Sequence, residues 1–470
     1  MNFKKEKRIE KKVEKKIGYE AKQDERDLKE IWRRVKKRDF SGNTGLVIKN
    51  SIYQLSTQII AKIGALIFTI ILARLLMPEL FGLYNLALST ILVFVAFSQL
   101  GLSQAIVTFI SKELGKKGKK TLSYLIYFGK IKASLVLASA IFLLTLSGFI
   151  ANNFYQKPIF LALLAGSLYI IFVQAVSFLQ YLAQASNSFK GVLQKEIVFQ
   201  VLRVILVPLI IILSINHSIS DEKTLMLVIL SLALSLFLTS IFLFFDINKI
   251  YFKKYKEKNK KLSKNQKKSV NKFVIATAVL ALSGLFFNYI DKIMLGRFVE
   301  AEFIGYYTAA FSLVGALIPI VSFSAIVLLP IFSRLKGKRL ERGFKKSMKL
   351  TLGLSIVLFM IVLLIAPQAI SLIYGGEYTL SIGILRILSL LLVILPLTGI
   401  YTTYFVSNKK PQTVAKLLIF TTMLNIVLNY LLITYLVRYG DLSAVYGVST
   451  ATLISQGVLL VGLILKRKNA

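Results

Sequence analysis

Long apolar stretches recur along the chain from Leu46 onward, each close to the roughly 20 residues that an α-helix needs to cross a bilayer. Because a lipid-exposed strand would leave backbone N–H and C=O groups without partners, we interpret each stretch as a transmembrane helix. The twelve predicted helices cover about residues 48–73, 81–109, 122–149, 158–184, 196–215, 224–246, 273–296, 305–332, 349–373, 382–406, 412–436 and 444–465. The pattern predicts an all-α polytopic membrane protein.

Residues 1–42 follow a different pattern, with 16 Lys/Arg and 9 Asp/Glu. Apolar residues recur there at helical spacing, as at Ile9, Val13 and Ile17. That spacing fits either an amphipathic helix on an anionic membrane surface or a solvated, partly helical tail. The segment lacks the short charged start and immediate apolar run of a signal peptide, so we expect it to remain as a basic cytoplasmic tail.

The composition agrees with a membrane protein and sets its orientation. Apolar residues make up 56% of the 470 residues, yet the formal net charge is +38. With the N-terminus inside, 48 of the 60 Lys/Arg fall in inner segments and five in outer loops. This asymmetry predicts two cytoplasmic termini in the cell membrane. The Lys-rich stretch 249–268 lies between two predicted membrane helices and has no interleaved aromatic stacking pattern, so we expect it to attract anionic lipid headgroups and not nucleic acid.

Few residues of this chain could act in catalysis or bind a metal ion. It has no cysteine and a single histidine, His217. Disulfides, thiolate metal sites and cysteine nucleophiles are excluded, and almost no ligand set for zinc remains. We therefore predict no catalytic residues, no metal site and no cofactor.

An internal repeat links the outer end of the first predicted helix to that of the seventh. The first copy reads Arg74, Glu79, Gly82, Tyr84 and Ala87, and the second, 223 residues later, reads Arg297, Glu302, Gly305, Tyr307 and Ala310. Each half holds six helices, so the two repeats are parallel and should face each other across a central cavity, as in transporters. We expect six-helix bundles at 43–247 and 273–466, joined by a Lys-rich cytoplasmic linker at 248–272.

Further motifs occur in the second half. They are the run Tyr289–Gly296, the run Tyr374–Tyr378 leading into Leu385–Leu388, and the set Asn425, Asn429 and Tyr430. Together with the Gly-x-Tyr-x2-Ala repeat, they resemble polysaccharide-biosynthesis flippases of the Wzx type, in the multidrug/oligosaccharidyl-lipid/polysaccharide (MOP) exporter superfamily. The resemblance covers about residues 43–466. It implies a MATE-like fold of two bundles and inner-to-outer movement of a polyprenyl-linked oligosaccharide by alternating access.

Lys62 is the cation that helix geometry forces into the membrane. If Lys62 lay at the inner surface, the eleven residues before Arg74 would span only ~17 Å of a ~30 Å hydrocarbon core. An unpaired lysine there costs about 2.5–3.5 kcal/mol on insertion scales, so it normally faces water or a partner. Asn50, Gln54 and Gln58 precede it at intervals of four, which predicts a polar stripe lining a cavity. Snorkelling or a structural contact is the alternative.

Four other charged residues are weaker candidates. Arg203 fits a cavity position or an inner-interface anchor equally well, and Lys132 fits an interface anchor better. Arg386 lies near an outer helix end, where it can snorkel, but the resembled family has a similar arginine there. Asp291 is a candidate for proton or Na⁺ coupling, although a structural role is favoured.

Three function classes compete. A lipid-linked oligosaccharide flippase needs a cationic cavity for the anionic (pyro)phosphate head, and this function is the favoured hypothesis. A MATE-like drug or organic-cation exporter needs buried carboxylates, of which Asp291 is the one candidate away from a loop. A membrane-embedded polymerase or glycosyltransferase needs acidic or His residues on a large loop, which the short outer loops lack. We expect a monomer working alongside glycan polymerases or glycosyltransferases.

Overall fold

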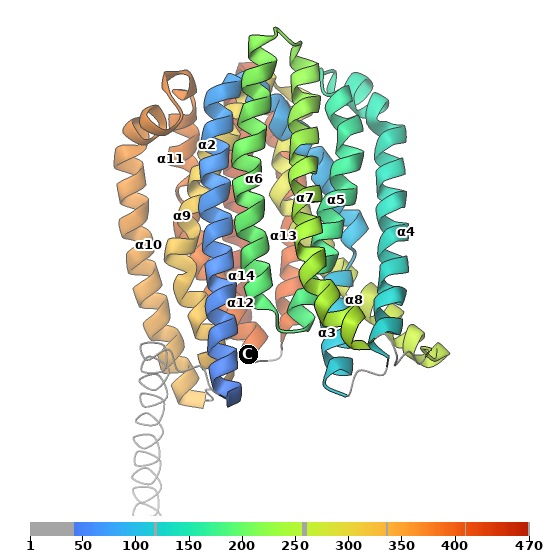
Figure 1. Ribbon diagram of the computed structural model, residues 1–470. Coiled ribbons are helices and arrows are strands. Elements are labelled where there is room, and N and C mark those ends of the chain that lie inside the picture. The colour runs from blue at the N-terminus through green and yellow to red at the C-terminus, as the bar shows by residue number, and fades with distance from the viewer. Residues whose placement is uncertain (1–41, 117–119, 256–260, 335–336, 409, 469–470) are drawn as a thin grey trace, which may run out of the picture.

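The computed structural model describes residues 42–116, 120–255, 261–334, 337–408 and 410–468, and all its elements there are helices (Figure 1). The predicted tail lies outside these residues apart from Gly42. The helices are α2 (Gly42–Gln99), α3 (Leu102–Leu114), α4 (Thr121–Gly148), η1 (Phe149–Tyr155), α5 (Phe160–Ala185), α6 (Phe189–Asn216), α7 (Asp221–Tyr255), α8 (Lys264–Phe298), α9 (Ala301–Arg334), α10 (Gly337–Ile373), η2 (Gly376–Tyr378), α11 (Ser381–Leu388), α12 (Leu391–Ser407), α13 (Pro411–Leu436), η3 (Val437–Tyr439) and α14 (Asp441–Lys468).

The predicted all-α polytopic architecture is confirmed. Ten helical ranges among the described residues are long and apolar enough to cross a membrane. One of them, Ile48–Leu114, holds the first two predicted helices, and α8 holds the seventh, so every predicted helix falls on a helix. Large apolar side chains are exposed along these helices, among them Ile275, Leu364 and Leu372. Such a belt fits contact with lipid tails.

The chain turns back on itself inside α2. Met77 interrupts this helix with φ 59° and ψ 171°, and Pro78 follows it. A residue before proline is disfavoured in the α region, so the helix breaks there and a second segment starts. In Figure 1 the start of α2 and the following α3 both lie at the lower end, so the two segments of α2 cross the bundle in opposite directions. We call the lower end, which carries the Lys-rich start of α8, the basic end, and the other the far end.

Two predicted helices are each divided. The helix predicted at 81–109 ends at Gln99 and resumes as α3 after Gly101, whose φ is 71°. The helix predicted at 382–406 is split into α11 and α12 at Ser389, whose hydroxyl donates to the carbonyl of Arg386 (2.6 Å). A side chain bonded in this way competes with the helical backbone ladder. Apolar periodicity does not report either break, because both flanking segments stay apolar.

Helices also extend into the range predicted as the linker. α7 continues to Tyr255, and α8 begins at Lys264 after a capping box in which Ser263 and Gln266 bond each other's backbone N–H groups. Such a cap satisfies two donors that a helix start otherwise leaves unpaired. The first turns of α8 lie against α4, where the Tyr127 hydroxyl donates to Asn271 (2.8 Å). Thus α8 contacts the first bundle as well as the second.

Candidate functional site

Arg203 lies near the middle of α6, in the first bundle of helices. The helix begins at Phe189, seven residues before its predicted start, so Arg203 is about 21 Å from that end. An inner-interface anchor would lie within the first turns. The sequence left open whether Arg203 lies in a cavity at membrane depth or at the inner interface. Its place in α6 fits the position at membrane depth.

The guanidinium of Arg203 is surrounded by aromatic rings. Its Cζ lies 4.6 Å from the ring centroid of Phe68 on α2 and 5.1 Å from that of Phe199. The hydroxyls of Tyr84 and Tyr169 lie within electrostatic range. Its buried Nε and Nη2 atoms have no hydrogen-bond partner. Cation–π contacts contribute about 0.5–2 kcal/mol each but satisfy no N–H group, so this cation keeps donors free for an anion.

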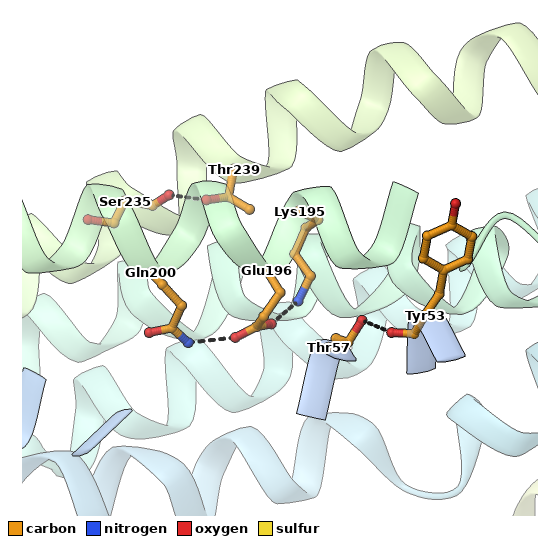
Figure 2. Close-up of polar contacts among 7 residues, drawn as sticks. All are labelled: Tyr53, Thr57, Lys195, Glu196, Gln200, Ser235 and Thr239. Atoms are coloured by element: carbon orange, nitrogen blue, oxygen red, sulfur yellow. Dashed lines mark hydrogen bonds and ion pairs between the residues drawn. The ribbon is translucent and has the colours of Figure 1, made fainter. Parts of the chain in front are cut away.

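A polar cluster of α6 lies on the basic side of Arg203, beside α2 (Figure 2). The ammonium of Lys195 pairs with Glu196 at 2.9 Å, and Gln200 donates to the same carboxylate at 2.6 Å. Gln200 packs against Gly64 of α2, where a Cβ would overlap its side chain. The prediction that Asp291 is the one carboxylate away from a loop is therefore wrong. Glu196 is also buried within a helix, which the sequence missed because α6 starts earlier than expected.

Lys62 and Gln58 are both exposed on α2, and Gln54 is half-buried with an Oε1 atom that lacks a partner. Lys62 is two residues before Gly64, and two helical residues point about 200° apart. Since Gly64 faces α6, Lys62 projects away from α6. In Figure 1, α9 and α10 lie on that other side of α2. Lys62 is thus exposed on the side of α2 that is turned away from α6.

Lys132 is only 5% exposed, which is more burial than an interfacial anchor would have. Its ammonium donates to the Gln174 side-chain oxygen and to the carbonyl of Ser98 (3.5 Å). Gln174 in turn donates to the carbonyl of Val95 (2.7 Å). These partners are neutral, so Lys132 is buried without a carboxylate bonded to it among the described residues. Gln174 serves here to hold helices together.

Asp291 is the centre of a polar cluster in the second bundle. The carboxylate is 5% exposed and accepts hydrogen bonds from Tyr307 (2.6 Å), Asn429 (2.7 Å) and Thr452 (2.8 Å). Asn429 also donates to Asn425 (3.3 Å), and its own Oδ1 atom has no partner. These residues come from α8, α9, α13 and α14. The sequence offered Asp291, Asn425 and Asn429 separately, and the fold joins them.

Arg386 is exposed on α11. Among the described residues, it forms no hydrogen bond or ion pair with another predicted site residue. The predicted candidates therefore do not form one constellation. Arg203 and Lys132 belong to the first bundle, Asp291 belongs to the second, and Lys62 is exposed on the side of α2 turned away from α6.

The equivalent tyrosines of the two repeat copies lie near side chains of opposite charge. Tyr84 of the first copy lies near the guanidinium of Arg203, while Tyr307 of the second copy donates to the carboxylate of Asp291. Both tyrosines are buried. The fold thus places Arg203, with unpartnered N–H groups among the described residues, in one half, and Asp291, with Lys292 within electrostatic range, in the other. The N–H groups of Arg203 can bind an anionic group.

Solved structures with this fold are transporters and flippases. A lipid II flippase MurJ in an inward closed conformation has a TM-score of 0.68 at 18% identity, covering 89% of this chain and 87% of that one. An inward-facing multidrug resistance MATE transporter of the MOP superfamily has a TM-score of 0.69 at 14% identity, covering 87% and 94%. A MOP superfamily transporter from Pyrococcus furiosus has a TM-score of 0.52 at 14% identity, covering 90% and 95%.

Comparisons of sequence give a family. No curated protein matches the chain. Residues 275–431 match the MatE family. Residues 47–336, more than half of the chain, match the family described as Polysaccharide biosynthesis protein. The chain therefore belongs to the family described as Polysaccharide biosynthesis protein.

Proposed function

We propose that this protein is a flippase that moves a lipid-linked oligosaccharide with a phosphate or pyrophosphate head from the inner to the outer leaflet by alternating access. It would serve cell-surface polysaccharide or glycoprotein synthesis and act as a transporter, not as an enzyme. The observation that carries the proposal is Arg203, a cation near mid-helix with two buried nitrogens that lack partners.

Charge supports an anionic cargo over a cationic one. Lys132 and Arg203 lie in the first bundle without a directly bonded carboxylate. Glu196 and Asp291, the carboxylates buried in helices where the structure describes burial, already accept hydrogen bonds or an ion pair. Charge-assisted N–H bonds to phosphate are about twice as strong as neutral ones. A polyprenyl phosphate head would therefore gain most from this site.

A MATE-like exporter of small molecules is the second candidate, favoured by the MatE match over residues 275–431. An organic cation would have to use Asp291, which three neutral donors hold. Substrate competition separates the two functions, because a cationic drug and a polyprenyl pyrophosphate would not share a cationic site. A membrane-embedded polymerase or glycosyltransferase remains the less favoured alternative.

The proposal includes an orientation and a coupling ion. We infer that both termini are cytoplasmic, with the basic end toward the cytoplasm and its anionic lipids. We also infer that Asp291 couples transport to a proton or Na⁺ gradient, because it is a buried carboxylate and Asn429, which donates to it, has a side-chain oxygen without a partner among the described residues. Carboxylate and amide oxygens suit hard cations, and a buried carboxylate can instead bind a proton.

A flipping assay tests the function directly. Protein reconstituted into vesicles should make a fluorescent polyprenyl-pyrophosphate oligosaccharide, placed in one leaflet, accessible from the other. The phospholipid analogue with a zwitterionic head is the control and should stay in its leaflet. If the zwitterionic analogue crosses as fast as the pyrophosphate lipid, the protein does not select an anionic head and the proposal fails.

Replacement of Lys62 by glutamate is expected to reduce transport of the pyrophosphate lipid at least about tenfold. The change reverses an exposed charge on α2, along the proposed path of the head, and tenfold corresponds to about 1.4 kcal/mol. The Lys62→Arg variant should keep most activity. Lys130→Glu is the matched control, because it reverses another exposed lysine, on α4. Wild-type transport by Lys62→Glu would remove Lys62 from the pathway.

A further inference from the structure

The repeated glycines Gly82 and Gly305 meet where the two halves touch at the far end. Both glycines are buried. A Cβ on Gly82 would lie 3.0 Å from the Gly305 nitrogen and 2.7 Å from the Ala301 carbonyl carbon, closer still to its oxygen. A Cβ on Gly305 would lie 3.0 Å from the Pro78 carbonyl carbon. The backbone at the start of a helix from the other half therefore packs directly against each glycine.

The obstruction that a side chain would meet is backbone, which cannot rotate away as a flexible side chain can. The second segment of α2 starts at Pro78 and α9 starts at Ala301, so two helix starts cross at this point. Packed backbones yield little, and overpacking typically costs about 1–3 kcal/mol or more. Any residue larger than glycine at either position would push the two halves apart.

Other contacts between the halves gather around the same crossing. Arg74 donates through Nε to the carbonyl of Ile373 (2.8 Å), at the end of α10. Tyr378 donates to the carbonyl of Ala73 (2.8 Å), and its ring packs against Phe81 at 6.2 Å between centroids. Beyond the crossing, Leu86 of α2 is fully buried and packs against Gly296 of α8. The far end is therefore shut by backbone contact and covered by hydrogen bonds.

We propose that the crossing of Gly82 and Gly305 is the far-end gate of the transporter, and that these glycines are the residues that allow it to close. The inference rests on the proposed alternating access, in which this end must open to release cargo. Because the repeat places one glycine in each half, the gate is symmetric, and a side chain at either position holds it open. Closure of the far end therefore depends on the absence of a side chain at Gly82 and at Gly305.

Cysteine labelling tests the gate without any substrate. The chain has no cysteine, so Leu86→Cys gives a single thiol just beneath the crossing. In intact cells, an impermeant maleimide should label this thiol slowly in the otherwise unchanged protein. Adding Gly82→Val or Gly305→Val should speed labelling roughly tenfold, as a shift of the gate toward the open state would. Unchanged labelling in both variants would overturn the proposal.

Gly315→Val is the matched control, since Gly315 lies on the same helix as Gly305 and a Cβ there meets nothing within 4 Å. Labelling of Leu86→Cys should be unaffected by it. Gly82→Ala and Gly305→Ala add one methyl group each and should give intermediate rates. If Gly315→Val raises labelling as much as the gate variants do, the effect is general loosening and the gate assignment is wrong.

A second measurement leaves both glycines in place. Lys157 and Glu300 lie across the halves at the far end, with their charged atoms 3.7 Å apart. A short cleavable thiol cross-linker between cysteines at these two positions should lower the transport rate at least about tenfold. Reduction of the cross-linker should restore the rate. Full transport by completely cross-linked protein would show that this end does not open.

The two proposals fail in different ways. If labelling follows the glycine variants but the pyrophosphate lipid is not flipped, the gate stands and the cargo is wrong. If the lipid is flipped but labelling ignores the glycines, the proposed function stands and the gate lies elsewhere.

Discussion

Replacing Arg203 by glutamine is expected to reduce flipping of a pyrophosphate lipid by about 10–100-fold. Hydrogen bonds to charged groups contribute about 1.5–3 kcal/mol, and 1.4 kcal/mol corresponds to a factor of ten. Two nitrogens of the guanidinium have no hydrogen-bond partner in the described part of the chain and are free to bind the phosphate oxygens. Glutamine keeps some length and polarity while removing the charge and the planar fork. The measurement is the initial rate in vesicles against lipid concentration.

The thermal stability of the Arg203→Gln variant separates a binding role from a structural one. A structural arginine would leave its partners unpaired, and its loss would lower the melting temperature. Arg203 has unpaired nitrogens and two aromatic neighbours, so its loss should leave stability within about 1–2 kcal/mol. Lys190→Gln, at an exposed lysine on the same helix, is the control. Normal flipping by Arg203→Gln would exclude the proposed cargo site.

Arg203→Lys refines the same experiment. Lysine keeps the charge but presents a compact ammonium in place of two parallel N–H donors. If the head is held by both free nitrogens, lysine should restore only part of the rate. Full rescue by lysine would indicate that charge alone attracts the head.

Replacing Asp291 by asparagine is expected to remove the response of transport to an imposed proton or Na⁺ gradient. The change is nearly isosteric, but the amide can neither bind a proton at neutral pH nor carry the negative charge that attracts a cation. Tyr307, Asn429 and Thr452 would keep a polar partner at the same place. The ratio of the rates with and without a gradient should fall to about one. An unchanged ratio in vesicles of the variant would remove Asp291 from the coupling.

Thr452→Val is the matched control for Asp291→Asn. It deletes one donor to the carboxylate but keeps the charge, so the gradient response should persist. A lost hydrogen bond to a charged group should instead lower stability by about 1.5–3 kcal/mol. Tests with separate proton and Na⁺ gradients then identify the coupling ion.

The predictions for Arg203 and Asp291 are related, because these two side chains carry opposite charges in opposite halves. Arg203 and Asp291 sit near equivalent tyrosines of the repeat, Tyr84 and Tyr307. Cargo binding at one centre and ion binding at the other would then act on opposite sides of the same crossing of Gly82 and Gly305. Double variants of Arg203 and Asp291 therefore test whether the two centres are energetically coupled, as non-additive effects on the rate would reveal.

The fold was largely readable from the pattern of apolar residues. Lipid requires each spanning segment to satisfy its backbone internally, so a long apolar run has one solution, a helix. Helix breaks were not readable, because Met77 and Ser389 act through backbone angles and a local hydrogen bond within apolar surroundings. The true start of α6 was missed for a related reason. Lys195 and Glu196 look like loop charges, and only their pairing makes them compatible with burial.

The sequence by itself determined where the apolar helices lie and the repeat, because hydrophobic length and spacing are local properties of the chain. It also supplied Lys62 from distance alone. Only the tertiary structure decided which charges have partners. It left Arg203 with unpaired nitrogens, placed Lys132 among neutral groups, and joined Asp291 to three helices. It also brought Gly82 against Gly305, a contact between residues 223 positions apart, which depends on the packing of two halves and not on either alone.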